Sequence, residues 1–571
     1  MDVHTKSLFR AAVTVAAVCT LAGCGGSGGT SDSRIVVGGA LPIEAECGTD
    51  EFGRADLSQM NNPVFVDSRS VHAAANCGLS PATACPDVQT GIDVCQSELC
   101  GGVLVRHGQY DVGEPIVLPR TGITLYGSCR FGNEADRGQR TLLLGTSQTP
   151  GVPVVAGYVV IDALALTQMR GFAVVAKDES ANPGVASVAM SFRFSGGLTV
   201  RGNLIASGPG GDGSMVPTSA TPQGNAGGNG GEKPSGAGPD GGAAACGGTA
   251  AGGHGGAGQF GGADPSCQPG ACPCSVFGST TGAPGESSAE GLAGGGSSSR
   301  VSTPGPWCVG AVPNLFYGDA GGAGRGGACS SVAGTAVSDV RGGFVVDPSL
   351  LLRWQPGAMP TSGGAGTQGS GGGGGNSGGF CVDLDQQPQV ILHGVPGGGG
   401  GAGGCGGAGG IAGGHGGASF AVLLEFAEVN GLNQGENGNL IVTALPGRGG
   451  DGGNGGDGGA GGAGGLGGQG NVKKIGSSLV GVYACPGLSG DGGKGGEGGA
   501  GAGGAGGNSG PVAAFVLRTG SVQPTSLTGI YAVEPSPAGA GGAGGATSSG
   551  NCRGAQAPTG AQGPAANWLA Y

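Results

Sequence analysis

Glycine supplies 142 of the 571 residues of this chain, whereas charged residues make up 11% and aromatic residues 4%. Ordinary domains hold about 7% glycine and about 25% charged residues, so this chain cannot bury a conventional core along its whole length. The formal net charge of −12 disfavours nucleic acid and anionic lipid headgroups as partners.

The N-terminus is typical of a bacterial lipoprotein signal peptide. Two basic residues precede a short apolar run, residues 11–21, that is too brief to span a bilayer. The run ends in Leu-Ala-Gly-Cys at residues 21–24, which resembles a lipobox. This resemblance implies that residues 1–23 are removed and that Cys24 becomes the lipid attachment site, with palmitate among its acyl chains. An ordinary secretory signal peptide with a chance cysteine is the alternative.

The residue after the lipobox predicts where the protein goes. Gly25 follows Cys24 instead of an aspartate, and by the same resemblance this implies transfer to the outer membrane and display at the cell surface. No other segment approaches 18 consecutive apolar residues, so the acyl chains are the only predicted membrane attachment. Cleavage removes Asp2, Lys6 and Arg10, which changes the net charge from −12 to −13.

The cysteine count agrees with export. Of 18 cysteines, Cys19 leaves with the signal peptide and Cys24 carries lipid, which leaves an even number for disulfides in an oxidising compartment. The cluster of Cys267, Cys272 and Cys274 fits no zinc-binding spacing. We therefore expect disulfides and no metal or other cofactor.

Residues 24–60 begin with a Gly/Ser-rich stretch and lack sustained periodicity, so they are predicted to be a flexible tether. From residue 61 to 205 short apolar strands alternate with Gly, Pro and Asp turns, which predicts an all-β fold. The clearest strands carry alternating apolar pairs: Val103 and Val105, Ile116 and Leu118, Ile123 and Leu125. Outside the signal peptide, a helical period is suggested only over Ser68–Cys77.

The order of "PVFVD", a Cys-containing stretch, "VLVRHGQYDV" and "PIVLPRTGITLYGSC" resembles the opening of pectate-lyase-like proteins. That resemblance implies a right-handed parallel β-helix across residues 61–205. A β-sandwich is the competing fold.

From residue 185 onward the chain repeats one pattern, in which an apolar strand, a turn and a second strand lead into a glycine tract, and residues 206–571 are predicted to be β-helix coils interrupted by these tracts. The copies start at Val185, Gly417 and Gly510, and shorter returns are predicted at 380–395 and 477–487. A solenoid tolerates such variable spacing when insertions leave at one turn position. The sequence therefore predicts β-helix coils from which glycine-rich (GGX) loops emerge.

The glycine tracts have a three-residue period. From Asp451 every third residue is not glycine, through Asn454 and Asp457 to Gln469, as in a threefold helix of polyproline type. Such helices can pack laterally as polyglycine II bundles, and plain disorder is the alternative. A calcium-binding nonapeptide is rejected because Asn454 and Gly456 replace its aspartate and its apolar residue. Ice binding is disfavoured by charged residues at the third positions.

Evidence for catalysis is weak. Asp383 and Asp385 would share one strand face and form the best carboxylate pair, although an exposed strand face is the favoured explanation for them. Arg106 and His107 lie near the predicted cap, where solvated polar residues are normal. His254 and His415, each within "GGHGG", could meet across stacked loops and bind a metal.

The composition resembles that of glycine-rich bacterial surface proteins of the PE-PGRS-like kind, although the N-terminal module of true members is absent. The resemblance implies an envelope location and a non-catalytic structural, adhesive or protective role. Expected partners are the membrane, through the lipid anchor, and extracellular polysaccharide or neighbouring surface proteins. The alternative is a polysaccharide-binding or polysaccharide-degrading β-helix, a lyase or glycoside hydrolase.

Overall fold

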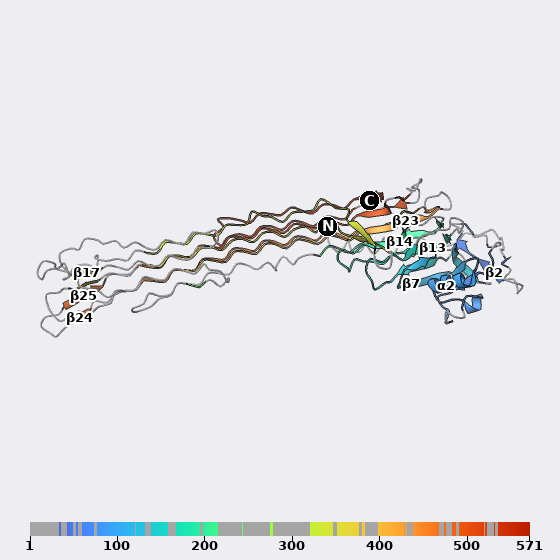
Figure 1. The fold of residues 1–571 in the computed structure, drawn as a ribbon, viewed down its shortest axis with the longest axis horizontal. Helices are drawn as coiled ribbons and strands as arrows, with labels where there is room; N and C mark the ends of the chain where they lie inside the picture. The colour runs from blue at the N-terminus through green and yellow to red at the C-terminus, as the bar shows by residue number, and fades with distance from the viewer. Residues whose placement is uncertain are drawn as a thin grey trace.

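A computed structural model describes the fold of this chain (Figure 1). The residues that it describes are 34–35, 43–49, 53–54, 57, 60–72, 77–119, 122–131, 139–157, 167–193, 198–214, 242–243, 275–277, 320–346, 351–375, 380–382, 398–427, 429–430, 438–467, 473–475, 482–486, 490–518, 520–521, 530–531 and 535–571.

Three parallel sheets form the body of the protein. The first contains β5 (Val64–Val66), β6 (Val103–Arg106), β9 (Thr124–Phe131), β12 (Thr167–Arg170), β15 (Leu198–Arg201) and β22 (Val429–Asn430). The second contains β7 (Gly108–Val112), β10 (Thr141–Gly145), β13 (Phe172–Val175), β16 (Leu204–Ala206), β23 (Leu440–Val442) and β27 (Ile530–Tyr531). The third contains β8 (Ile116–Leu118), β11 (Val155–Gly157), β14 (Ser187–Arg193), β21 (Ser419–Glu425), β26 (Val512–Leu517) and β28 (Ala565–Ala570).

The chain visits these sheets in a fixed rotation. The strands β6, β7 and β8 belong to the first, second and third sheets in that order, and the rotation repeats with β9, β10 and β11 and with β12, β13 and β14. Each strand pairs in parallel with the strand of the next turn. This confirms the predicted all-β, parallel architecture and contradicts the β-sandwich alternative, whose sheets are antiparallel.

The alternating apolar residues of the sequence point into one core between the sheets. Val103, Leu125 and Leu118 are buried in it as predicted, and Phe172, Phe192 and Phe515 fill it farther along. The corners between the first and second sheets use glycine where the backbone turns through a left-handed conformation, with φ of +82° at Gly171. Nearby, the buried Asn203 side chain donates to Asn439 Oδ1 at 3.1 Å, which satisfies polar groups inside the corner.

Among the described residues, the α-helix does not lie where the sequence suggested one. It is α2, which spans Val88–Glu98, whereas Ser68–Cys77 contains no helix among its described residues. The Asp87 side chain caps α2 by accepting a hydrogen bond from Thr90 N at 2.8 Å. Val88, Ile92 and Cys95 on its inner face close the end of the core. The polar composition of α2 hid this pattern, because only one narrow face is apolar.

Part of the segment 24–60, which was predicted to be a flexible tether, is ordered against the body. Short strands occur there: β1 (Arg34–Ile35) and β2 (Ile43–Glu46) extend the first sheet in antiparallel fashion, and β3 (Gly48–Thr49) pairs with β4 (Gly53–Arg54). Cys47 is bonded to Cys129 on β9, and Leu57 is fully buried. Covalent attachment and burial therefore hold part of this segment on the first sheet.

The predicted disulfides are present in the described part of the chain. The pairs are Cys47–Cys129, Cys77–Cys85, Cys95–Cys100 and Cys329–Cys552. The second and third close short loops around η2 (Pro81–Thr83) and the end of α2. Of these four pairs, three lie near the N-terminal end of the body, and Cys329–Cys552 links distant glycine tracts.

Glycine excursions leave the body at one repeated position, between a strand of the second sheet and a strand of the third. They connect β16 to β21, β23 to β26, and β27 to β28. The prediction of insertions at a single turn position is confirmed. The excursions run side by side away from the sheets as a long bundle (Figure 1).

The shorter returns predicted at 380–395 and 477–487 are not coils of the parallel sheets. Their described residues form β20 (Phe380–Val382) and β25 (Val482–Pro486), which pair antiparallel with each other. With β17 (Ser275–Phe277) and β24 (Lys473–Ile475) they make a separate four-stranded sheet at the far end of the bundle (Figure 1). Apolar composition alone did not reveal which strands would become their neighbours.

Candidate functional site

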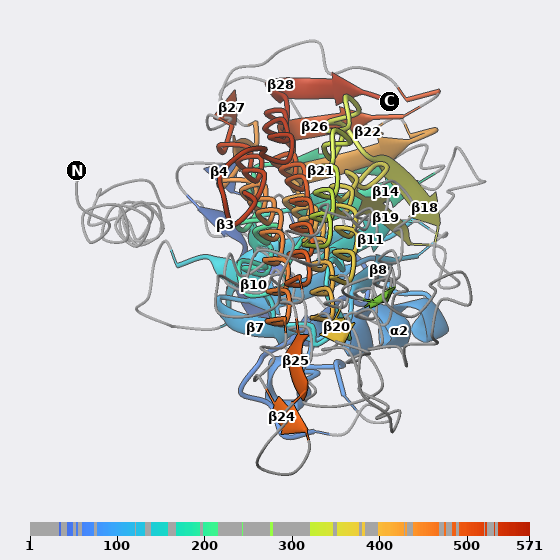
Figure 2. The ribbon, with the colours of Figure 1, turned by 90° about the vertical axis from the view of Figure 1, so that its left-hand side faces the viewer.

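The glycine tracts form a hydrogen-bonded bundle, and tract 490–510 lies at its centre. Backbone bonds join it to six other tracts: 320–334, 361–375, 398–417, 447–467, 537–546 and 553–564. Figure 2 shows the tracts nearly end-on as neighbouring coils. One central threefold helix with six neighbours is the hexagonal arrangement expected of packed polyglycine II helices.

The bonds between tracts repeat every three residues. Gly495, Gly498 and Gly501 donate to Gly462, Gly459 and Gly456 of the antiparallel tract 447–467, at 2.8–2.9 Å. On another side, Gly401, Gly404 and Gly407 of the parallel tract 398–417 donate to Gly493, Gly496 and Gly499. Successive residues of one tract therefore bond to different neighbours, which uses the backbone polar groups of an interior that lacks large side chains.

Glycine is required because the backbones approach closely. A Cβ added at Gly495 would lie 1.9 Å from Ala402 O, and one at Gly501 would lie 1.9 Å from Ala408 O. In contrast, a Cβ at Gly326 on the outer tract 320–334 would meet only Glu497 O at 3.7 Å. Two glycines per triplet are therefore needed where a tract has neighbours on most sides. This close packing explains why the non-glycine residues keep a strict three-residue period.

Side chains at the third positions bond neighbouring tracts. Asp451 Oδ1, Asn454 Oδ1 and Asp457 Oδ1 accept hydrogen bonds from the amides of Ala540, Ala543 and Ala546 at 2.7, 2.9 and 2.6 Å. These residues therefore act as a ladder of acceptors along tract 537–546.

The same device operates on the opposite edge of the bundle. Ser370 Oγ and Thr367 Oγ1 accept from the amides of Arg325 and Ala328 at 2.7 and 2.8 Å. The disulfide Cys329–Cys552 links this edge to the turn that joins tracts 537–546 and 553–564. At this edge the side-chain oxygens therefore accept hydrogen bonds from amides that have no backbone carbonyl as acceptor. The disulfide adds a covalent link between the tracts.

A hairpin within the first excursion folds back onto the body. Its strands are β18 (Gly343–Val346) and β19 (Leu352–Gln355). Trp354 and Phe344 pack against Phe420 on the outer face of the third sheet, with ring centroids 6.3 and 6.1 Å away. Trp354 Nε1 also donates to Arg341 O at 2.8 Å. The hairpin thereby fixes the base of the bundle against the sheets.

The histidine of tract 398–417 has a structural role. His415 is buried, its Nε2 lies 2.8 Å from Ala358 O, and its Nδ1 accepts from Asn508 N at 3.0 Å. Both ring nitrogens are therefore used within the bundle. His254, its proposed metal partner, lies outside the described residues, and no cluster of potential metal ligands occurs among those that are described.

Several predicted site residues fall outside the part of the chain that the structure describes. They are Cys24, Asp383 and Asp385, and the cysteines at 267, 272 and 274. The described parallel strands of the three sheets hold only two carboxylates, Asp111 in the second sheet and Glu425 in the third, and the antiparallel strand β2 adds Glu44 and Glu46 at the edge of the first sheet. Glu425 is buried between Arg193 and Arg518 and pairs with both, so it serves an internal ion-pair network.

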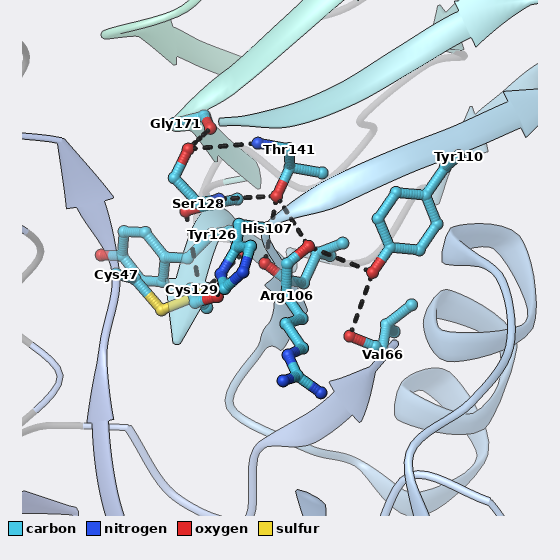
Figure 3. The surroundings of a disulfide bond; sticks show 12 residues. Cys47, Val66, Arg106, His107, Tyr110, Tyr126, Ser128, Cys129, Thr141 and Gly171 are labelled. Carbon is cyan, nitrogen blue, oxygen red and sulfur yellow. Dashed lines mark hydrogen bonds between the residues drawn. A yellow bond between two sulfur atoms is a disulfide. The ribbon is translucent and has the colours of Figure 1, made fainter. Parts of the chain in front are cut away.

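Arg106 and His107 lie at the cap region and serve structural roles (Figure 3). Arg106 forms an ion pair with Asp67 at 2.5 Å, and His107 Nδ1 lies 3.2 Å from Cys129 O. The hydroxyl of Tyr110 is held by the carbonyls of Val66 and Arg106, and burial raises the pKa of this hydroxyl. These contacts tie the corner between the first and second sheets to the strands β5, β6 and β9 of the first sheet.

The outer face of the first sheet carries one row with distinctive chemistry. The register aligns Tyr126, Arg170 and Arg201 on neighbouring strands, while the alternate residues, such as Met169, point into the core. Burial and the nearby charge of Arg201 lower the pKa of the Arg170 guanidinium. The three side chains are half-buried, and Tyr126 packs against the cluster that includes Cys47 and Leu57. The two guanidinium groups beside this ring could contact an anionic sugar.

No protein-family model matches this chain, and neither the curated proteins nor the solved structures compared with it include a match. In the described residues no helix is long and apolar enough to cross a membrane.

Proposed function

We propose that this chain is a lipid-anchored cell-envelope protein with a structural, adhesive or protective role at the cell surface. In this proposal its three parallel sheets are coils of a right-handed β-helix that displays the glycine bundle. The observation that carries it is the central tract 490–510, surrounded by six backbone-bonded neighbours. Such a bundle projects a long, rigid surface. Most of its backbone amides and carbonyls form hydrogen bonds between its own tracts.

The lipid anchor accounts for how this bundle would be held outside the cell. The lipobox-like residues 21–24 and the even number of remaining cysteines favour export, and the disulfides suit an oxidising compartment. Acyl chains on Cys24 would hold the protein at the outer membrane, while the excursions, which all leave the body at one corner, project together.

Membrane fractionation of the Cys24→Ala variant tests the anchor. The full chain should partition into membranes, and the variant should appear in the soluble fraction because it lacks acylation. Cys329→Ala is the matched control, since it removes a cysteine from the bundle and leaves the lipobox intact. Membrane retention of Cys24→Ala would refute the lipid anchor. Protease treatment of intact cells then tests display: protection of the wild type would exclude an outward-facing location.

A polysaccharide-binding or polysaccharide-degrading protein is the second candidate. The row of Tyr126, Arg170 and Arg201 favours it, since an aromatic ring and guanidinium groups can contact an acidic sugar. Incubation with acidic and neutral polysaccharides, with calcium present, separates the two candidates. Released reducing or unsaturated ends that disappear in Asp383→Asn with Asp385→Asn would favour the enzyme. Retention without product would favour binding.

A further inference from the structure

Among the described residues, one side of tract 447–467 is covered over only part of its length. The amides of Gly449, Gly452, Gly455 and Gly458 donate to the carbonyls of residues 537, 540, 543 and 546 at 2.8–3.2 Å. Tract 537–546 ends there, and tract 447–467 continues farther from the body (Figure 1). The same row of donors continues at Gly461 and Gly464, whose amides have no acceptor among the described residues.

Side-chain chemistry changes at the same point. Asp451, Asn454 and Asp457 face tract 537–546 and accept from its amides. The next third positions are Ala460, Ala463 and Leu466. Leu466 is 64% exposed, and none of the three carries a charge. Residues 458–467, called the distal edge below, therefore combine two open amides, those of Gly461 and Gly464, with small or apolar side chains. The next amide in the row, that of Gly467, donates to Asp491 Oδ1 at 2.7 Å.

We propose that the distal edge binds a glycine tract from a second copy of this chain. The edge is a direct continuation of an interface already formed within the molecule, so a tract placed there would extend an existing ladder with the same three-residue spacing. The occupant must supply carbonyls at that spacing and approach closely without a Cβ. The chain's own GGX tracts have both properties.

Within the bundle, glycine tracts pair in both the parallel and the antiparallel orientation. Tract 447–467 pairs in parallel with 537–546 and antiparallel with 398–417. A second copy can therefore dock in either direction. The formal charge of −12 opposes association at low ionic strength, and screening at about 0.15 M salt, with a Debye length of about 8 Å, relieves this repulsion.

Sedimentation velocity of the full chain carrying Cys24→Ala, over a range of concentration and salt, tests the proposal without the lipid anchor. The expected result is a reversible dimer that strengthens with salt. Adding Leu466→Glu and Ala460→Glu should weaken the dimer at least tenfold. Val332→Glu is the control, because Val332 is an equally exposed apolar residue, at 67%, on tract 320–334.

Hydrogen exchange supplies an independent readout. In the dimer, the amides of Gly461 and Gly464 should gain protection, whereas those of Gly495 and Gly498 should be protected at all concentrations and in all variants. Loss of protection at Gly495 would show that a variant had disrupted the bundle. In that case the single variant Leu466→Asp would be used in place of the disruptive variant. A chain that is monomeric at every concentration, or equal weakening by Val332→Glu, would overturn the proposal. Neither result depends on whether the protein is anchored to a membrane.

Discussion

Asp457 and Ala546 are 89 residues apart in the chain and are joined by a 2.6 Å hydrogen bond from the Ala546 amide to the Asp457 carboxylate. With Asp451 and Asn454, Asp457 forms a ladder whose spacing matches the glycine period. The side chains at the third positions of a glycine tract therefore help to determine which tract packs beside it.

Asp457→Ala removes one acceptor from this ladder. Because the Ala546 amide then lacks its partner, we expect a loss of about 0.5–1.5 kcal/mol in local stability. Asp457→Asn keeps an acceptor oxygen and should retain most of it. The exchange rate of the Ala546 amide measures the effect, and equal rates in wild type and Asp457→Ala would show that the bond contributes nothing.

Gly501→Ala places a methyl group against a backbone carbonyl in the central tract. Since the added Cβ would lie 1.9 Å from Ala408 O, the tracts must separate, and we expect destabilisation of about 1–3 kcal/mol or more. Gly326→Ala is the matched control, because its nearest non-neighbouring heavy atom would be 3.7 Å away. Thermal unfolding and glycine-amide exchange report the difference. Similar stability of the two variants would argue against close packing.

Trp354→Ala removes the main anchor of the β18–β19 hairpin. Trp354 is 8% exposed and contacts Phe420 on the third sheet, so truncation should cost about 3–5 kcal/mol. The effect should be local, with faster proteolysis between residues 341 and 357 and an intact body. Trp568→Ala is a useful comparison, since that side chain is 39% exposed and should lose less. Limited proteolysis with mass mapping measures both.

Glu497 should make the turn near Ser549 sensitive to acid. Hydrogen bonding from the Ser549 side chain is the main cause that lowers the pKa of Glu497. The stabilising contribution is therefore fully present above the unfolded pKa of about 4.3 and is lost as pH falls through the lower folded value. Exchange at the Ser549 amide, corrected for intrinsic rates, should increase over that acidic range. Glu497→Gln does not titrate and should remove this pH dependence.

The sequence by itself determined the local periods. Alternation at Val103 and Val105 predicted a β-strand, because strand side chains point to opposite faces. The strict triplets from Asp451 to Gln469 predicted a threefold helix, because only that geometry brings every third side chain to one face. The repeated order of strand and glycine tract likewise predicted that the insertions share one turn position.

Tertiary structure decided which segments become neighbours. The sequence did not predict that Asp451 and Asp457 would accept hydrogen bonds from tract 537–546. It left His415 as a metal candidate, whereas the fold places its ring nitrogens beside Ala358 and Asn508. Residues 380–382 and 482–486 are apolar enough for either sheet, and only their antiparallel partners place them at the far end. A local period specifies a segment's own geometry, whereas hydrogen-bond partners distant in sequence depend on how the whole chain packs.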